Sequence, residues 1–381
     1  MEAETLQLEA MKDGILGDGQ QSAFDFLFGE EMRVKDEVEK QGYALSDLPL
    51  WIFDADALKV QPKPLWRIDL ANKRYYYTFI DKLRTVPKFF ISVTSSIASL
   101  GLLPTNFGLI EWWAQFPTID VAKKEMNKLA DYGTFDHVLI GQFMKNGTLD
   151  LEIIPDLVYE YSKKNYLDYD NRFWTKYCRR DLIALDKWVK EHEVRPIAIE
   201  LMLCGKDGYA TMVDFICEMT IGSGSNGKIL KKDLNEGTCR RVHAIIDWKS
   251  MMSFTKHKSF HKTNEFQLEA CRRLVAENFP QLPIEKLYNV SFEGSIGTAE
   301  VVMKEQTDKA LKLVKIGETF STEFDLYWEI FKVNNPDYNQ PFDFDEVKGF
   351  VHLTKEAYAI NPRNISEIVI EKHRGYKYER D

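Results

Sequence analysis

The chain has 381 residues, of which 44% are hydrophobic and 13% aromatic, and it carries a formal net charge of −9. This composition excludes a disordered chain and indicates a globular protein with one large domain or two. No apolar run is long enough to span a bilayer, and the acidic start MEAETLQLEAMKDG has neither the basic nor the apolar part of a signal peptide. We therefore expect a cytoplasmic protein without a membrane partner.

The N-terminal part, residues 1–90, is predicted to be an acidic, partly helical lead-in followed by a β-hairpin. The segment PLWRIDLANKRYYYTFID, residues 64–81, indicates the hairpin because two β-prone runs flank a short polar turn. Two helical patterns follow between about residues 105 and 131. Gly133 is expected to open a separate helix, which carries His137.

Apolar strands separated by turns are predicted in the second half of the chain. They cover about 196–204, 209–219, 239–248 and 285–293. An amphipathic helix at 262–279 precedes the last of them. The segment 221–238 is rich in Gly, Ser, Asn and Lys, which predicts a long turn or a mobile flap over the site formed by the strands.

These elements predict an α/β (α+β) fold in which helices flank a mixed central β-sheet. We divide the chain into the lead-in and hairpin (1–90), a core (91–300) and a C-terminal helical extension (301–381). The five cysteines include no CxxC pair, which argues against a disulfide framework and against a zinc ribbon.

Two carboxylates and a lysine stand on the predicted strands. Asp214 interrupts the apolar run MVDFI, and Asp247 follows AII and precedes Lys249 by two positions. Because side chains alternate along a strand, Asp247 and Lys249 are expected on one face. A buried carboxylate is costly unless it is paired or binds an ion. The arrangement predicts an acidic cup that can hold a divalent cation beside an ammonium group, as phosphodiester hydrolysis requires.

Further polar residues accompany the cup: Glu200 on the preceding strand, His137 on a helix far upstream, and Gln267 on the downstream helix. Their order and their placement on a helix, three strands and a helix resemble the PD-(D/E)XK nuclease superfamily, in particular its RecB-type exonuclease branch. The resemblance covers roughly residues 90 to 295. Thr211 and Cys271 stand where this family usually has glycine and tyrosine.

The resemblance implies a PD-(D/E)XK core and a metal-dependent mechanism. It implies that Mg²⁺ or Mn²⁺ is held by Asp214, Asp247, the backbone carbonyl of Trp248 and His137. Catalytic roles are implied for Lys249, which would orient the attacking water, for Glu200, which would reach a second ion or a water, and for Gln267, which would steady the nucleotide or Lys249. Some RecB-type nucleases carry an iron–sulfur cluster bound by C-terminal cysteines, but no cysteine follows Cys271, so we expect none.

The resemblance thus implies a DNA exonuclease or flap nuclease of replication, recombination or repair, encoded by a phage and located in the host cytoplasm. Its partners would be DNA and a single-strand annealing or replication protein. The net charge of −9 is unfavourable for DNA binding, but residues 249–262 form a local basic stretch. The alternative is an inactive nuclease-fold protein that binds nucleic acid or belongs to a virion. A site-specific endonuclease is a third, weaker option.

Each site residue also has a structural interpretation. The carboxylates of Asp214, Asp247 and Glu200 could form ordinary ion pairs, and Lys249 could begin a surface loop. A histidine such as His137 on a helix is more often a packing residue than a ligand. Gln267 would complete a capping box if Asn264 were the N-cap of its helix.

Overall fold

The computed structural model describes residues 51–52, 54–59, 65–70, 73–80, 87–96, 107–147, 151–164, 171–249, 262–306, 313–316 and 319–339. The acidic lead-in before residue 51 and nearly all of the basic stretch at 249–262 lie outside the described residues.

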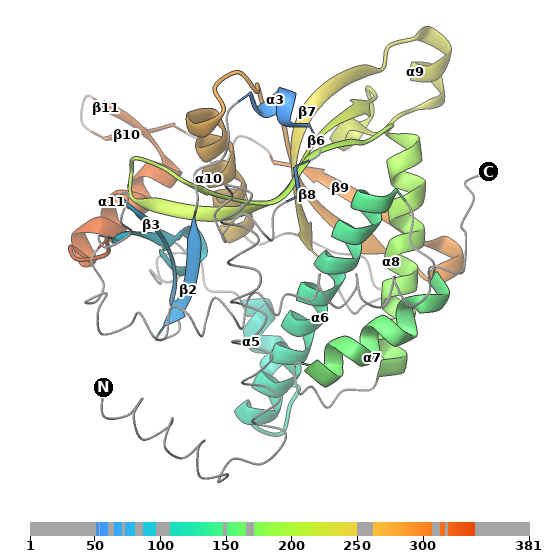
Figure 1. Cartoon of the computed structure of the whole chain (residues 1–381), viewed down its shortest axis with the longest axis horizontal. Coiled ribbons are helices and arrows are strands. Elements are labelled where there is room, and N and C mark those ends of the chain that lie inside the picture. Colours follow the sequence, from blue (N-terminus) through green and yellow to red (C-terminus); the bar gives the residue numbers. More distant parts are fainter. Residues whose placement is uncertain are drawn as a thin grey trace, which may run out of the picture.

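Nine strands of the described residues form one mixed sheet with helices on both faces (Figure 1). The strands run in the order β2 (Trp66–Leu70), β3 (Lys73–Phe79), β4 (Pro87–Ser92), β6 (Tyr209–Ile221), β7 (Arg240–Lys249), β8 (Lys286–Glu293) and β9 (Glu300–Glu305), while β5 (Arg195–Cys204) pairs with both β6 and β1 (Trp51–Ile52). The β4–β6 and β7–β8 pairs are parallel, and the other pairs are antiparallel. The predicted fold class is confirmed.

The predicted strands correspond to β5 to β8, and the predicted hairpin is the β2–β3 pair. The sheet continues across both domain boundaries drawn from the sequence. β4 spans residue 90, and β9 begins at Glu300 and pairs with β8 along its length. A cut at either boundary would therefore divide one hydrogen-bonded sheet.

Two hydrophobic cores lie on opposite faces of the sheet. One lies beneath α6 (Ile119–Asn146), α7 (Ile154–Lys164) and α8 (Asn171–Glu191), and the other beneath α10 (Lys262–Asn278) and α11 (Glu323–Asn334). The smaller elements are α3 (Ala55–Leu58), α4 (Val93–Ser96), α5 (Phe107–Trp113), α9 (Lys231–Glu236), the hairpin of β10 (Leu313–Ile316) and β11 (Thr319–Thr322), and the 3₁₀ turns η3 (Leu151–Ile153), η4 (Ser225–Gly227) and η5 (Ile296–Thr298). Within the described ranges, no helix combines the length and the hydrophobicity needed to cross a bilayer.

The prediction that Gly133 opens the helix of His137 is wrong. α6 is one helix of 28 residues, capped by Thr118, whose side chain accepts from the Val121 N–H, and ended by Gly147 in the left-handed conformation. A glycine inside a helix costs only about 1 kcal/mol relative to alanine. The cap at each end and the burial of Tyr132, Phe135 and Leu139 in the core outweigh this cost.

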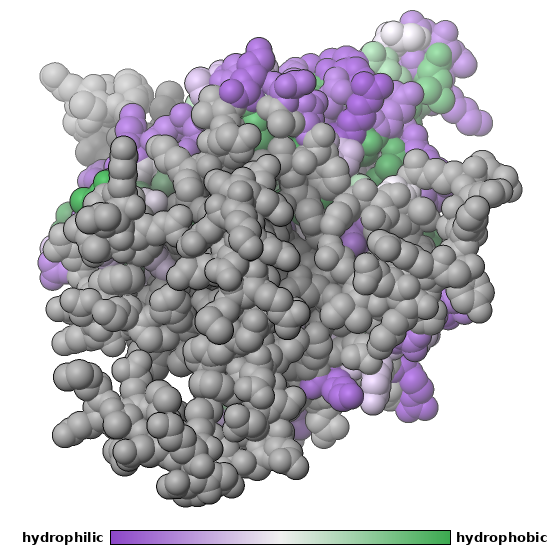
Figure 2. Space-filling view, viewed as in Figure 1, coloured by the Kyte–Doolittle hydropathy of each residue, from purple (hydrophilic) through white to green (hydrophobic). Residues whose placement is uncertain are grey.

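The prediction of a flap over the site is also wrong. Residues 222–239 form an arm at the far end of β6 and β7 that carries α9 (Figure 1) and lies beside a strongly hydrophilic part of the surface (Figure 2). Asp233 fixes the arm by accepting from the N–H groups of Ser223 and Leu230. Asp214 precedes the end of β6 by seven residues, roughly 23 Å of extended strand. The arm is therefore remote from Asp214.

Candidate functional site

The candidate site lies where one edge of β6 changes partner. β6 pairs with β5 along one edge, whereas its other edge pairs with β4 at Ala210 and with β7 from Phe215 onward. Asp214 lies between these two pairings, and the Trp248 N–H donates to its Oδ2 at 3.1 Å. Where the backbone ladder between β6 and β7 ends, the Asp214 side chain makes the next hydrogen bond between the two strands. We call the gap between β4 and β7 along this edge of β6 the fork.

Glu200 on β5 lies opposite Asp214 on β6, and at this pair the side chains of both strands switch from one face of the sheet to the other. The flanking pairs point to different cores, Ile199 and Phe215 toward the α6–α8 side, Leu201 and Val213 toward the α10 side. Residues two apart on a regular strand share a face, so the alternation is interrupted at this pair. Glu200 has φ 48°, a left-handed conformation that is strained for a residue with a side chain. Such strain is often found at functional sites.

Asp247 and Lys249 lie on one face of β7, as the strand period predicts. The Lys249 ammonium contacts both Asp247 oxygens, at 2.9 Å for Oδ1 and 2.7 Å for Oδ2. The Asp247 side chain is only 4% exposed, whereas that of Lys249 is 25% exposed. The ion pair therefore joins a carboxylate in the core to an ammonium group near solvent.

α6 brings His137 to the same place. Its Nε2 lies 3.2 Å from the Trp248 carbonyl oxygen, and its Nδ1 lies 3.9 Å from Asp214 Oδ2. The Trp248 ring stacks between Phe215 and Phe292 on the α6–α8 side and so holds this stretch of β7 against the helices. The structure therefore joins Asp214, Asp247, Lys249 and His137, residues up to 112 positions apart, which we call the fork cluster.

Burial dominates the electrostatics of the fork cluster. It raises the pKa of Asp247 to about 6 against the opposing effect of the Lys249 ammonium, and it also raises the pKa of Asp214. Burial and the nearby Lys249 ammonium lower the pKa of His137 to about 4. Burial alone would lower the pKa of Lys249, but the Asp247 and Asp214 carboxylates outweigh it and raise that pKa. The cluster thus combines two acids whose pKa values are raised with an imidazole whose pKa is lowered and an ammonium whose pKa is raised.

β8 contributes polar residues that the sequence reasoning missed. Asn289 is paired in register with Asp247 and donates from Nδ2 to Asp247 Oδ2 at 2.5 Å. Ser291 is paired in register with Lys249 and is fully buried. A signal was present, because YNVSFE alternates polar and apolar residues although β8 is covered on both faces, where strands usually read as continuous apolar runs.

α10 covers the fork cluster from the other side. The buried thiol of Cys271 interacts electrostatically with Asp247 and Asp214 and hydrogen-bonds to Thr211. Gln267 lies one turn earlier on α10 and is half-buried. α10 begins at Lys262, so the proposed capping box with Asn264 as N-cap is wrong.

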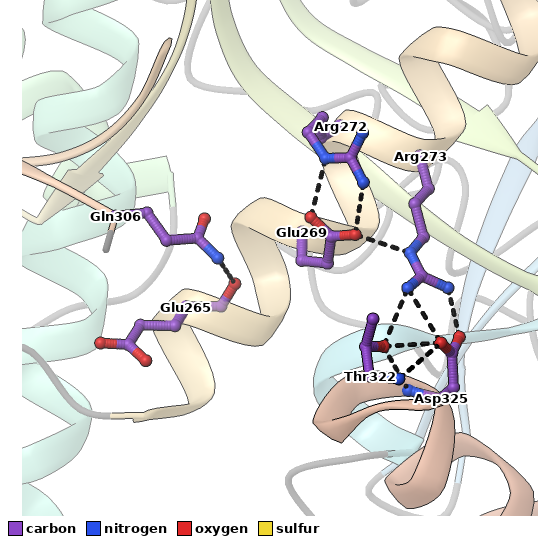
Figure 3. A network of polar contacts seen from close by, with 7 residues as sticks. All are labelled: Glu265, Glu269, Arg272, Arg273, Gln306, Thr322 and Asp325. Carbon is purple, nitrogen blue, oxygen red and sulfur yellow. Dashed lines mark hydrogen bonds and ion pairs between the residues drawn. The ribbon is translucent and has the colours of Figure 1, made fainter. Parts of the chain in front are cut away.

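Polar contacts fix α10 in place (Figure 3). Fully buried Glu269 accepts from both Arg272 and Arg273. Arg273 also donates to Asp325 and Thr322, which form the N-terminal capping box of α11 (Figure 3). The helix that carries Gln267 and Cys271 is therefore held rigidly to α11.

The donors of the fork cluster suit a divalent cation in their chemistry. Carboxylates, a backbone carbonyl and a neutral imidazole are ligands of Mg²⁺ or Mn²⁺. Their present contacts are with one another, however, since Lys249 and Asn289 occupy Asp247 and the Trp248 N–H occupies Asp214. In the described ranges, no group of three or more His, Cys, Asp or Glu side chains is placed so that it could hold a metal ion.

Comparisons of the chain with protein-family models, with curated proteins and with solved structures found no match.

Proposed function

We propose that this protein is a divalent-metal-dependent deoxyribonuclease that hydrolyses phosphodiester bonds, and that it acts as an exonuclease. The observation that carries the proposal is the fork cluster itself. A buried carboxylate, a second carboxylate that is 10% exposed and a partly exposed ammonium lie together at the fork in the ladder, next to a histidine from a distant helix. Buried charges of this kind are costly to retain, and titratable groups with perturbed pKa values are concentrated at functional sites.

Each residue has a role that follows from its position. Lys249 holds its ammonium beside Asp247, where it orients an attacking water and offsets the negative charge that develops on the phosphate. Asn289 and the Trp248 N–H fix the orientation of the two carboxylates. The neutral imidazole of His137 keeps a ring nitrogen directed at the Trp248 carbonyl.

A divalent cation would be held by Asp214, Asp247, His137 and the carbonyl of Trp248, and Glu200 would reach a second ion or a water. When bound, it supplies charge neutralisation at the phosphate and lowers the pKa of water. Gln267 steadies the nucleotide or Lys249 from α10. DNA is the proposed substrate in the cytoplasm, and a single-strand annealing or replication protein is the proposed partner.

The alternative is an inactive protein of the same fold that binds nucleic acid. The close Lys249–Asp247 contact favours the enzyme, because a binding protein has no need of a buried carboxylate held against a partly buried lysine. End-labelled linear duplex and closed circular DNA, each incubated with Mg²⁺, Mn²⁺ or EDTA, distinguish the two. Metal-dependent loss of linear DNA supports an exonuclease, and cleavage of both forms indicates an endonuclease. Binding without cleavage would support the alternative, and neither binding nor cleavage would contradict both.

A further inference from the structure

The polar row on β8 shows a hydroxyl group with unused bonding capacity. Ser291 Oγ is buried and, within the described part of the chain, has no hydrogen-bond partner. An unsatisfied buried hydroxyl costs about 1–3 kcal/mol, so such groups are rare in folded proteins. Its partner in the parallel register is Lys249, on the adjacent strand β7.

Ser291 shares a face with the fork cluster. Asn289, two residues earlier on β8, contacts Asp247 through its side chain, and residues two apart on a strand point to the same side. Neighbouring strands lie about 4.8 Å apart, a distance that the four-carbon stem of Lys249 spans easily. The ammonium has three donors and the hydroxyl oxygen can accept from it.

Lys249 and a cation compete for the same carboxylate oxygens. The ammonium now contacts both oxygens of Asp247, the residue that the proposed function assigns to the cation. When a cation binds, the ammonium must leave at least one of these oxygens. Because the Lys249 side chain is only 25% exposed, a displaced ammonium without an acceptor in the protein would regain few water contacts in exchange for those with Asp247.

We infer that Ser291 is a positioning residue that receives the Lys249 ammonium when a divalent cation takes its place on Asp247. Lys249 thus has two acceptors, the Asp247 carboxylate without the cation and the Ser291 hydroxyl with it. Asn289 stays on Asp247 Oδ2 in both states and keeps the carboxylate oriented. This inference rests on the proposed function, because it requires a cation at the fork cluster.

The first test measures Mn²⁺ binding by calorimetry, independently of DNA cleavage. Ser291→Ala is expected to weaken Mn²⁺ binding by about 10- to 100-fold, the range for loss of a hydrogen bond to a charged group. Ser162→Ala, at a buried serine of α7 on the other face, is the matched control and is expected to bind Mn²⁺ as the wild type does.

The second test asks whether the effect acts through Lys249. In the background of Lys249→Met there is no ammonium to relocate, so adding Ser291→Ala is expected to leave Mn²⁺ affinity unchanged. A merely structural serine would weaken binding equally in both backgrounds, and that result would overturn the inference. The double-mutant cycle therefore isolates the coupling between the two residues.

In thermal unfolding without metal, Ser291→Ala is expected to act in the opposite direction and to stabilise the protein, although it weakens Mn²⁺ binding. Ser291→Ala removes an unsatisfied hydroxyl, so the metal-free variant is expected to melt about 2–4 °C above the wild type. A lower melting temperature would show that Ser291 already has a partner and would also overturn the inference. Ser291→Thr keeps the hydroxyl and is expected to bind Mn²⁺ more tightly than Ser291→Ala does.

The failures of the two proposals are distinguishable. A wild-type protein that binds no Mn²⁺ contradicts the proposed function and the inference together. A wild-type protein that binds Mn²⁺ and cleaves DNA, with a Ser291→Ala variant that binds Mn²⁺ equally well, contradicts the inference alone.

Discussion

The protein contains two clusters of buried charge that share an electrostatic feature and differ in their surroundings. The fork cluster lies at the opening between β4 and β7. The second, which we call the helix cluster, consists of Tyr132, Asp136, Arg180 and Asp181 between α6 and α8. In each cluster, burial raises the pKa of an aspartate to about 6, Asp247 in one and Asp181 in the other.

The contacts within the helix cluster are those of a structural lock. Asp181 accepts from Tyr132 Oη at 2.6 Å and from Arg180 Nε at 2.5 Å, and its side chain also hydrogen-bonds to Asp136. Arg180 and Asp181 are completely buried. In the fork cluster, by contrast, the side chains of Lys249 and His137 are 25% and 23% exposed. A raised carboxylate pKa therefore indicates burial alone. What distinguishes a candidate ligand-binding site from a purely structural cluster is the partial exposure of its side chains to solvent.

Removing Arg180 is expected to have the largest effect on stability. Arg180→Leu leaves Asp181 buried without its cationic partner, so the free energy of unfolding should fall by about 3–5 kcal/mol in urea titrations. Arg179→Leu is the matched control, because its partner Glu152 is 84% exposed and such surface pairs contribute about 1 kcal/mol or less. Equal losses for the two arginines would contradict the assignment of the helix cluster as a lock.

Removing Lys249 is expected to affect chemistry more than folding. Lys249→Ala should lower the rate of DNA cleavage by about 10²–10³-fold, the usual range for one preorganised group that stabilises developing charge. Lys190→Ala, which removes an exposed lysine of α8, should cleave at the wild-type rate. Circular dichroism checks that both variants are folded. Near-normal turnover by Lys249→Ala would remove this residue from the mechanism.

Replacing His137 tests whether α6 contributes to cation binding. His137→Gln should weaken Mn²⁺ binding by about tenfold or more and Mg²⁺ binding less, because Mg²⁺ prefers oxygen ligands. His243→Gln, on the half of β7 near the arm, is the control. Unchanged Mn²⁺ affinity in calorimetry would assign His137 to packing, like the members of the helix cluster.

Replacing Asp214 should produce a smaller, pH-dependent gain in stability. Burial raises the folded-state pKa of Asp214, so the folded chain loses stability as pH rises through that pKa. Asp214→Asn keeps an acceptor for the Trp248 N–H but removes the charge. In EDTA, its melting temperature should exceed that of the wild type by a few degrees at pH 8 and by less at pH 5.

Local patterns were sufficient to predict the strands and the relation of Asp247 to Lys249. The runs that form β5 to β8 are apolar and bounded by turns, so their positions follow from the chain itself. The strand period placed Asp247 and Lys249 on one face, where they form an ion pair. The catalytic and metal-binding roles given to these residues stay predictions.

Other features depend on contacts that no local pattern contains. The change of face at Glu200 requires a left-handed residue within an otherwise regular strand. The helix through Gly133 and the remote arm show that single glycines and glycine-rich segments do not fix where an element lies. Asp136 and His137 are neighbours on α6, yet one belongs to the lock and the other to the fork cluster, which only the packing of α6 decides.

The fork also has a consequence for the order of folding. β5, β6 and β7 follow one another in the chain and pair as antiparallel neighbours, so their contacts close short loops. β4 must instead pair with β6 through Ser92 and Ala210, which are 118 positions apart in the chain. Contacts of such high sequence separation carry a larger loop-closure entropy and slow folding. We therefore expect β4, which forms one side of the fork, to join the sheet late, after the strands that carry Asp214 and Asp247 have already paired.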